Sequence, residues 1–372
     1  MINTKLLKPE ERAVFSLRSL YHRYGYFPYK MSKFEEYDLY VKNKDFLISE
    51  GIITFTDTKG KLLALKPDVT LSIIKNSKDV GERLSKVYYN ENVYRIAKGA
   101  REYREILQTG LECIGAIDAY HVTEVLALAV RSLAILSPEY MLNISHVGLL
   151  GALLEPFAMD EKTVTTLFSA LTKKNEGAIM ALVSDGLLTE NAARLAVCLL
   201  REYQTVEDAK IALAPYLMTT AAKNAFDEFA ALISSLRSLG LAEHIRIDFS
   251  VINHSGYYSG VVFKGYIKGI PDGVLAGGQY DRIMRKMGRR DGAVGFAVYL
   301  DALASLERDA VAYDTDILLL KNGASVDTVL AAVETLSADG SSVTVLDEVP
   351  NEFRAKKIFI LKGGEVLNYG ND

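Results

Sequence analysis

The chain has few of the residues that build metal sites and disulfide frameworks. It contains two cysteines, five histidines and no tryptophan in 372 residues. Cys113 and Cys198 do not have metal-ligand spacing, and two cysteines in a chain of this length do not indicate a disulfide scaffold. The composition therefore favours a reducing cytoplasm, and it gives no indication of a bound metal or other cofactor.

The chain also lacks an excess of positive charge and a long hydrophobic run. Its 43 basic and 47 acidic residues leave a net charge of −4, whereas proteins dedicated to nucleic acids are more often basic. The most apolar run, residues 122–136, is interrupted by Glu124 and Arg131 and is too short to span a bilayer. The first residues are polar and do not resemble a signal peptide. We therefore expect neither a nucleic-acid partner nor a membrane.

What remains is an ordinary globular composition, 49% hydrophobic and 24% charged, in a chain long enough for more than one domain. The pattern predicts a main domain over residues 1–308, with an almost entirely helical insert at about 149–241 that carries no polar cluster of a chemical kind. Residues 309–314 are the expected linker. A small α/β unit is predicted over residues 315–372, where a strand at 315–320, a helix at 326–336 and strands at 342–346 and 357–361 follow one another.

The most informative stretch runs from Val93 to Gly115. Strands are predicted at 86–95 and 106–114, joined by a charged loop around Gly99. Because a strand has a period of two, Gln108, Gly110 and Glu112 share one face. Two hydrogen-bonding side chains on either side of a bare glycine suit the floor of a small polar-ligand pocket. The alternative is a surface hairpin whose Gln and Glu face water.

The chain before this stretch contains a predicted helix and a predicted hairpin, and two further candidate polar residues follow the hairpin. A helix is predicted at 9–24, with proline at its first position, and a hairpin at 52–65, with a Lys59-Gly60 turn. Asp68 and Thr70 follow this hairpin, where a strand end meets a helix start. They are either helix caps or ligand contacts, and the local sequence does not distinguish the two.

Elements after it predict the rest of the main domain. A helix is expected at 121–136, strands at 246–249, 257–267 and 274–280, and a short helix at 281–287. The pair Gly277-Gly278 could bind a phosphate, but a tight strand turn is the favoured interpretation. The basic run from Arg285 to Arg290 is either a solvated helix end or a surface for an anionic partner.

Four segments, in order, resemble the histidyl-tRNA synthetase family of class II aminoacyl-tRNA synthetases. GIITFTDTKGKLLALKPDVT resembles the segment that contains TFTD and LALRPEGT. Residues 93–115 resemble motif 2, INHSGYYSGVVF resembles the histidine-specific signature RGLDYYTGTVFE, and GVLAGGQYDRI with GAVGFAVYLDAL resembles motif 3 and its approach. The resemblance implies an α+β fold: an antiparallel sheet with flanking helices, a helical insert and a small C-terminal unit.

The resemblance also implies a histidine pocket. Asp68 corresponds to the acidic residue near the ligand's α-amino group, and Thr70 and Gln108 take the neighbouring polar positions. Glu112 corresponds to the carboxylate that meets the imidazole, and Tyr258, next to Tyr257, to the tyrosine beside it. A carboxylate and a phenol suit imidazole N–H groups, and an ammonium group prefers a charged acceptor.

The positions for ATP chemistry depart from the family. Asn253 stands where the family has an arginine that stabilises the reacting groups, and Ala302 replaces the arginine of motif 3. Tyr299 replaces a motif 3 glycine. Arg95 remains, and Arg95 and Arg104 are the candidate contacts to a phosphate or other anion. Phosphoryl chemistry depends on fixed positive charge, so these losses argue against an active synthetase.

A kept histidine pocket, lost ATP arginines and a shortened C-terminal unit together resemble the regulatory subunits of ATP phosphoribosyltransferase. That resemblance implies a non-catalytic, allosteric, histidine-binding subunit that acts in the first step of histidine biosynthesis. The implied partners are a short-form catalytic subunit and a second copy of the chain in a hetero-oligomer. The alternatives are a divergent histidyl-tRNA synthetase, another histidine-activating ligase or a tRNA-binding regulator.

Overall fold

The computed structural model describes residues 7–43, 47, 51–77, 84–96, 102–252, 258–307 and 313–369. The chain divides into two compact units, one formed by Lys8–Leu306 and the other by Met1–Leu7 together with Glu307–Asp372. The larger unit contains the sheet that carries the candidate site, and the smaller unit is described by itself below.

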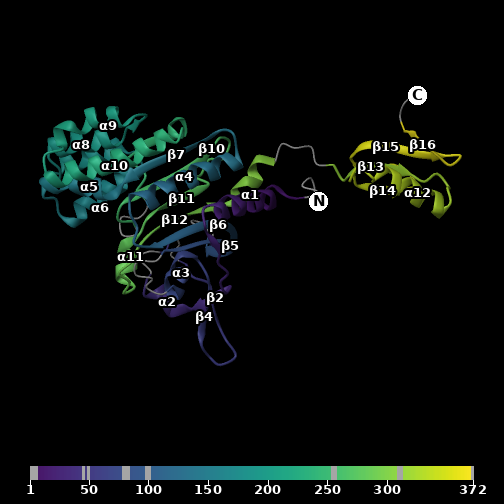
Figure 1. Cartoon of the computed structure of the whole chain (residues 1–372), viewed down its shortest axis with the longest axis horizontal. Helices are drawn as coiled ribbons and strands as arrows, with labels where there is room; N and C mark the ends of the chain where they lie inside the picture. The colour runs from purple at the N-terminus through teal and green to yellow at the C-terminus, as the bar shows by residue number, and fades with distance from the viewer. Residues whose placement is uncertain are drawn as a thin grey trace. The chain divides into compact units, whose positions relative to one another are not determined.

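A nine-stranded sheet organises the larger unit (Figure 1). Its strand order is β1-β5-β6-β12-β11-β10-β7-β9-β8. The strands are β1 (Phe27–Pro28), β5 (Ser85–Ile96), β6 (Tyr103–Gly115), β7 (Tyr140–His146), β8 (Glu202–Tyr203), β9 (Ile245–Asp248), β10 (Val261–Ile267), β11 (Leu275–Gln279) and β12 (Gly292–Tyr299).

Most neighbouring strands are antiparallel, as the sequence predicts, but β1 pairs with β5 and β7 pairs with β9 in parallel. The predicted strands at 86–95, 106–114, 246–249 and 274–280 are confirmed within a few residues. The sequence pattern did not predict β7 and β8. β7 begins just after Ser137 and Pro138, which mark the end of a helix and hide the strand that follows.

Two helices cover one face of this sheet. α4 (Ala119–Leu136) packs across β7, β10, β11 and β12, and α1 (Pro9–Arg23) packs against β5 and β6. Asp118 caps α4 by accepting a hydrogen bond from the backbone N–H of His121 at 3.0 Å. α4 is long and apolar enough to cross a membrane by length and composition, but 56% of it is buried inside the fold, and its apolar residues join the core formed with Leu111, Phe263 and Phe296.

The opposite face of the sheet receives smaller elements near β5 and β6. β2 (Phe34–Glu36), β3 (Thr54–Thr56) and β4 (Leu62–Leu65) form a three-stranded antiparallel sheet in the order β2-β4-β3, so the predicted hairpin is confirmed and gains a third strand. α2 (Tyr37–Val41) and α3 (Thr70–Asn76) follow β2 and β4. Residues of α3 share a second core with Tyr89, Ile114 and Tyr280 and with α11 (Asp281–Lys286).

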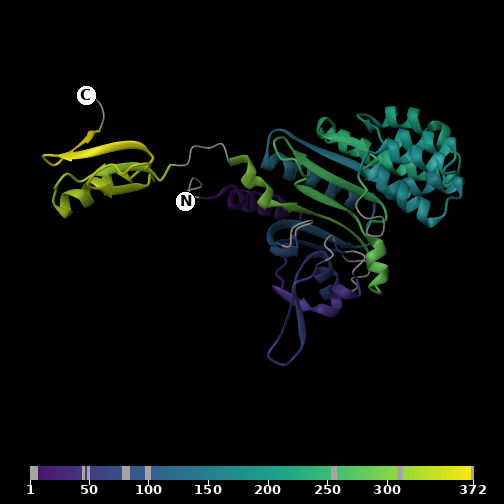
Figure 2. The same ribbon diagram turned by 180° about the vertical axis from the view of Figure 1, so that it is seen from behind.

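Residues 147–238 form the predicted helical insert, which Figures 1 and 2 both show beside the β7 and β10 side of the sheet. Its apolar residues are continuous with the core beneath α4. The short strand β8 joins the insert to the main sheet by pairing with β9. The insert comprises α5 (Val147–Leu154), α6 (Glu161–Thr172), α7 (Glu176–Ser184), α8 (Glu190–Leu199), α9 (Val206–Leu213) and α10 (Thr220–Ser238).

The smaller unit is the predicted α/β unit. β13 (Thr315–Leu320) lies between two parallel neighbours, β14 (Val343–Leu346) and β15 (Ala355–Lys362), and α12 (Val326–Leu336) connects β13 to β14. The sequence pattern did not predict β16 (Glu365–Asn368), which is antiparallel to β15. Leu319, Ala332 and Leu361 form its buried core. Between β12 and β13 in the sequence, the chain forms the 3₁₀ helix η6 (Leu300–Glu307).

Candidate ligand-binding site

Strand register collects the predicted site residues on the sheet face opposite α4. Glu112 of β6 lies opposite Gly295 of β12, and Gly295 lies opposite Gly278 of β11. Directly paired residues project to the same face, so this row presents one carboxylate beside two bare glycines. Phe296 projects to the other face, into the core under α4.

Each glycine in this region leaves space that a neighbouring side chain fills. A Cβ at Gly295 would lie 1.8 Å from Oε2 of Glu112, and one at Gly278 would lie 2.6 Å from the ring of Tyr258. A Cβ at Gly110 would lie 2.6 Å from the hydroxyl of Tyr89. Gly278 therefore belongs to a strand and makes room for a tyrosine, so the favoured tight-turn interpretation was wrong.

Glu112 is buried, with 2% of its surface exposed, which excludes the water-facing hairpin. Thr70 donates its hydroxyl to Oε1 of Glu112 at 2.7 Å, and Tyr280 donates to Oε2 at 2.5 Å. Burial raises the pKa of Glu112 to about 8, against the lowering effect of these two hydrogen bonds. Among the described residues no lysine or arginine forms an ion pair with this carboxyl group.

Asp68 lies at the start of α3, close enough to Glu112 for the two carboxyl groups to interact electrostatically. Its Oδ1 accepts from the backbone N–H of Leu71 at 2.8 Å, so it does cap the helix, as one of the two sequence interpretations held. Burial raises its pKa, while the hydrogen bond from Leu71 and the charge of Arg95 oppose that rise. Arg95 also donates through Nε to the carbonyl of Pro67 at 2.9 Å.

Gln108 lies two residues before Gly110 on the same face and is 3% exposed. Glu91 and Tyr299 are its register partners on the neighbouring strands. Nζ of Lys66 forms an ion pair with Glu91 at 2.5 Å, and the lysine side chain is almost fully buried. At this end of the face, Gln108 therefore lies between the ring of Tyr299 and the carboxylate of Glu91, whose charge Lys66 already neutralises.

The structure brings the predicted residues together unequally. Thr70 and Glu112 are in direct contact, Asp68 interacts with Glu112 through its charge, and Gln108 and Tyr258 flank them on the same face. Arg104 lies opposite Arg95 in the β5–β6 register and is exposed. Two further residues lie outside the described ranges: Tyr257, and Asn253, which stands where the family has an arginine.

Two tyrosines belong to the site but were not predicted from the sequence as contacts. Tyr280 is 2% exposed and donates to Glu112, and Tyr89 is equally buried, with a pKa raised by burial and by the charge of Glu112. Tyr89 shares one face of β5 with Val87 and Glu91, so the period of two could have placed it beside the site. Tyr280 follows the last residue of β11, and local sequence does not connect it to β6.

The arrangement suits the binding of a small ligand. The described residues contain no cluster of three His, Cys, Asp or Glu side chains that could hold a metal ion. Glu112 and Asp68 offer acceptors to a ligand that carries N–H groups or a positive charge, inside a buried environment where such hydrogen bonds are strong. Tyr258 packs against the glycine floor nearby. The site therefore fits a small polar ligand with several donors.

A mostly antiparallel sheet with its site on the face opposite two packed helices defines a class II aminoacyl-tRNA synthetase-like protein. The chain belongs to the histidyl-tRNA synthetase family, whose sequence profile matches residues 5–303. The match covers the nine-stranded sheet, the helical insert and every candidate site residue, and it ends before Glu307–Asp372.

Relatives and solved structures agree with this assignment. An ATP phosphoribosyltransferase regulatory subunit from Clostridium kluyveri is 27% identical over 77% of this chain and 75% of its own length. One from Acetivibrio thermocellus is 24% identical over 96% and 87%. A Bacillus halodurans protein described as such a regulatory subunit or a histidyl-tRNA synthetase matches with a TM-score of 0.73 and 25% identity over 95% and 93%.

One further structure shows the fold at lower identity. A chain of an ATP phosphoribosyltransferase complex from Thermotoga maritima matches with a TM-score of 0.61 and 19% identity, over 80% of this chain and 97% of that chain. At this identity the likeness shows that the two chains share a fold.

Proposed function

We propose that this chain is a non-catalytic regulatory subunit of an ATP phosphoribosyltransferase, acts in the first step of histidine biosynthesis, and senses L-histidine. Relatives of similar length are named ATP phosphoribosyltransferase regulatory subunits, and the chain spans most of their length. The sensing pocket comprises Asp68, Thr70, Gln108, Glu112 and Tyr258, with Tyr257 as a further proposed contact and Tyr280 added by the structure.

The arrangement around Glu112 carries the proposal. Both of its oxygens accept from neutral hydroxyls, and no cation of the described residues compensates its charge. A buried carboxyl group in this state gains strongly from a ligand that supplies an N–H donor or a positive charge. The imidazole and ammonium groups of histidine supply both, and Asp68 provides a second acceptor.

The opposite end of the face supports a loss of ATP chemistry. Tyr299 places an aromatic ring beside Gln108 where the resemblance has a glycine, and Ala302 stands where it has an arginine. Glu91, on the other side of Gln108, adds an acid rather than a phosphate-binding cation. Arg95 and Arg104 remain as candidate anion contacts, but Arg95 is already bonded to the backbone of Pro67.

The proposal includes two protein partners. A short-form catalytic subunit carries out the transfer, and histidine shifts the assembly toward a state in which that subunit is inhibited, which requires unequal histidine affinity in two states. A second copy of the chain completes a hetero-oligomer, and a biosynthetic role of this kind belongs in the cytoplasm.

The decisive experiment mixes the purified chain with the short-form catalytic subunit from the same source. Formation of phosphoribosyl-ATP is measured with and without L-histidine, for the unchanged chain and for Glu112→Gln. We expect the unchanged chain to stimulate the reaction and histidine to inhibit it. Glu112→Gln should keep the stimulation and lose most of the inhibition, because the amide cannot provide the charged acceptor.

Glu139→Gln is the matched control. Glu139 is an exposed acid, paired with Lys268 at 2.6 Å, and its replacement should change neither stimulation nor inhibition. Unchanged histidine inhibition in Glu112→Gln would place the sensor elsewhere. Failure to stimulate a folded partner, together with pyrophosphate exchange at saturating histidine and ATP, would replace the proposal with a histidine-activating ligase.

A further inference from the structure

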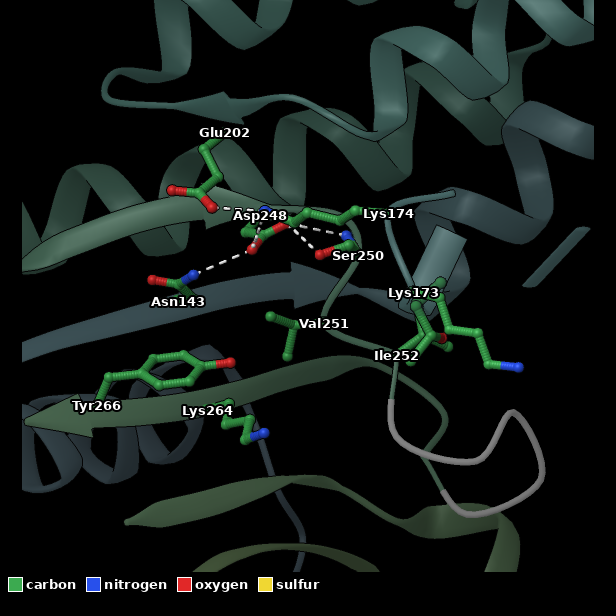
Figure 3. A pocket seen from close by; sticks show the side chains of 11 residues that line it. Asn143, Lys173, Lys174, Glu202, Asp248, Ser250, Val251, Ile252, Lys264 and Tyr266 are labelled. Carbon is green, nitrogen blue, oxygen red and sulfur yellow. Dashed lines mark hydrogen bonds and ion pairs between the residues drawn. The ribbon is translucent and has the colours of Figure 1, made fainter. Parts of the chain in front are cut away.

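A second polar cavity lies on the same sheet face, between the sheet and the helical insert, and has a volume of about 530 Å³. Figure 3 shows strand β10 on one side of it and the turn after α6 on the other. Asn143 and Lys264 are paired in register with each other and project to the face that carries Glu112. The cavity is lined by Asn143, Thr172, Lys173, Lys174, Glu202, Asp248, Ser250, Val251, Ile252, Lys264 and Tyr266.

The two acids of this cavity are already compensated by one lysine. Nζ of Lys174 lies 2.5 Å from Oε1 of Glu202 and 3.1 Å from Oδ2 of Asp248. Asp248 also accepts from Nδ2 of Asn143 at 3.0 Å and from the hydroxyl of Ser250 at 2.6 Å. Asp248 is 2% exposed, and its acceptor capacity is largely used within the protein.

Lys264 and Tyr266 form the side of the cavity whose polar groups are not taken up by ion pairs with the cavity's acids. They are two residues apart on β10, so both project toward the same face, and the Lys264 ammonium lies 5.2 Å from the centre of the Tyr266 ring. Lys264 forms no ion pair with any residue in the described part of the chain. Three lysines and two acids give the lining a net charge of plus one, and the available groups are mainly donors.

We propose that this cavity binds the phosphate group of a small phosphorylated metabolite, with Lys264 as the main charged contact and the Tyr266 hydroxyl as a second donor. The lining contains lysines and no arginine, and lysine acts on phosphate as a point charge. The volume is within the range of small-molecule sites. Val251 and Ile252 supply an apolar wall for the uncharged part of the ligand.

This site is distinct from the histidine pocket. Strands β11 and β12 separate Lys264 on β10 from Glu112 on β6, which places them about 14 Å apart at the usual strand spacing. Lys173, Lys174 and Glu202 come from the insert, so a ligand here would contact both the insert and the sheet. The site therefore does not depend on the histidine proposal.

Isothermal titration of the full chain with inorganic pyrophosphate tests the proposal, with three variants compared at constant ionic strength. Lys264→Met removes the proposed contact and keeps most of the aliphatic volume. Lys268→Met removes the same charge nearby, from an exposed lysine that pairs with Glu139. Tyr266→Phe removes only the hydroxyl. We expect at least about a tenfold loss for Lys264→Met, a smaller loss for Tyr266→Phe and less than about a twofold change for Lys268→Met.

The outcomes separate this site from the histidine pocket. Pyrophosphate binding should persist in Glu112→Gln and at saturating histidine. Equal losses in Lys264→Met and Lys268→Met would show a general charge effect and overturn the proposal, as would the absence of binding at millimolar pyrophosphate. If the chain binds histidine but not pyrophosphate, the phosphate-site proposal is wrong and the histidine proposal is unaffected. If it binds pyrophosphate but not histidine, the phosphate site is supported and the histidine pocket is not.

Discussion

Glu112 and Asp248 are two buried acids on one sheet face that the protein treats in opposite ways. Each is 2% exposed. Asp248 has an ammonium group, an amide, a hydroxyl and a backbone N–H as partners, whereas Glu112 has two neutral hydroxyls. Burying a carboxylate without a cation is costly. The contrast distinguishes an acid that holds the fold together from one that we propose is left available to a ligand.

The largest effect should come from filling the space beside Glu112. Gly295→Ala places a Cβ 1.8 Å from Oε2 of Glu112 and 2.4 Å from the carbonyl of Leu111, and the backbone atom cannot move aside. We expect a loss of about 3 kcal/mol in the free energy of unfolding and no measurable histidine binding, by urea denaturation and calorimetry. Gly151→Ala, which has nothing within 4 Å of its new Cβ, should be neutral or slightly stabilising.

Asp248→Ala should damage the fold and leave the proposed histidine site intact. It removes the acceptor of Asn143 and Ser250 and one of the two acids beside Lys174, which should cost about 2 kcal/mol in the free energy of unfolding. Histidine affinity should stay within about twofold, because the pocket is several strands away. Asp227→Ala, on the exposed side of α10, is the control. A larger loss of histidine affinity would erase the contrast between the two acids.

The pH dependence of stability should report the burial of Glu112. The folded pKa of Glu112 is about 8, against an ordinary value of 4.5. Between these values the unfolded chain has released the proton that the folded chain still holds, so this group makes the protein less stable as pH rises. From pH 5.5 to 7.5 we expect a loss of about 1.5 kcal/mol, below the full slope of 1.36 kcal/mol per unit.

Denaturation of Glu112→Gln over the same range measures this contribution. The difference between pH 5.5 and 7.5 should shrink, while Asp227→Ala should keep the slope of the unchanged protein. Saturating histidine should also reduce the loss at pH 7.5, since a ligand that prefers the ionised carboxylate compensates its burial. An unchanged slope in Glu112→Gln would mean that the acid is ionised and compensated in the free protein.

Local periodicity was sufficient to predict one side of the site. The alternation along β6 places Gln108, Gly110 and Glu112 on one face, and the register with β12 confirms that face. Thr70 required more, because its contact with Glu112 spans 42 residues of sequence. The resemblance, rather than periodicity, connected them. Tyr280 is 168 residues from Glu112, and strand order alone brings the two together.

The second cavity could not be predicted from the sequence for a similar reason. Lys173 and Lys174 lie in an exposed turn after α6, where no hydrophobic period constrains the sequence, so the insert was expected to lack a chemical polar cluster. The contact between Lys174 and Asp248 depends on β8, a strand of two residues. Elements this short carry little sequence signal, and β7, which holds Asn143, was missed as well.

The smallest expected effect tests whether the hydroxyls around Glu112 prepare it for a ligand. Tyr280→Phe removes the donor to Oε2 of Glu112 and keeps the ring, so it should weaken histidine binding by about 1 kcal/mol, measured by calorimetry. It should also raise the pKa of Glu112 further, because that hydrogen bond opposes the effect of burial. Binding should then weaken more at pH 7 than at pH 9.

Tyr40→Phe is the matched control for this last change. The Tyr40 hydroxyl is also fully buried but has no hydrogen-bond partner in the part of the chain that the structure describes. Because the Tyr40 hydroxyl lies near Asp68 but not at Glu112, removing it should change histidine binding less than Tyr280→Phe does. It should not destabilise the protein, since the hydroxyl is buried without a hydrogen bond. Equal effects of the two variants would mean that Tyr280 contributes through packing, and that the Glu112 carboxyl group binds its ligand without help from a second hydroxyl.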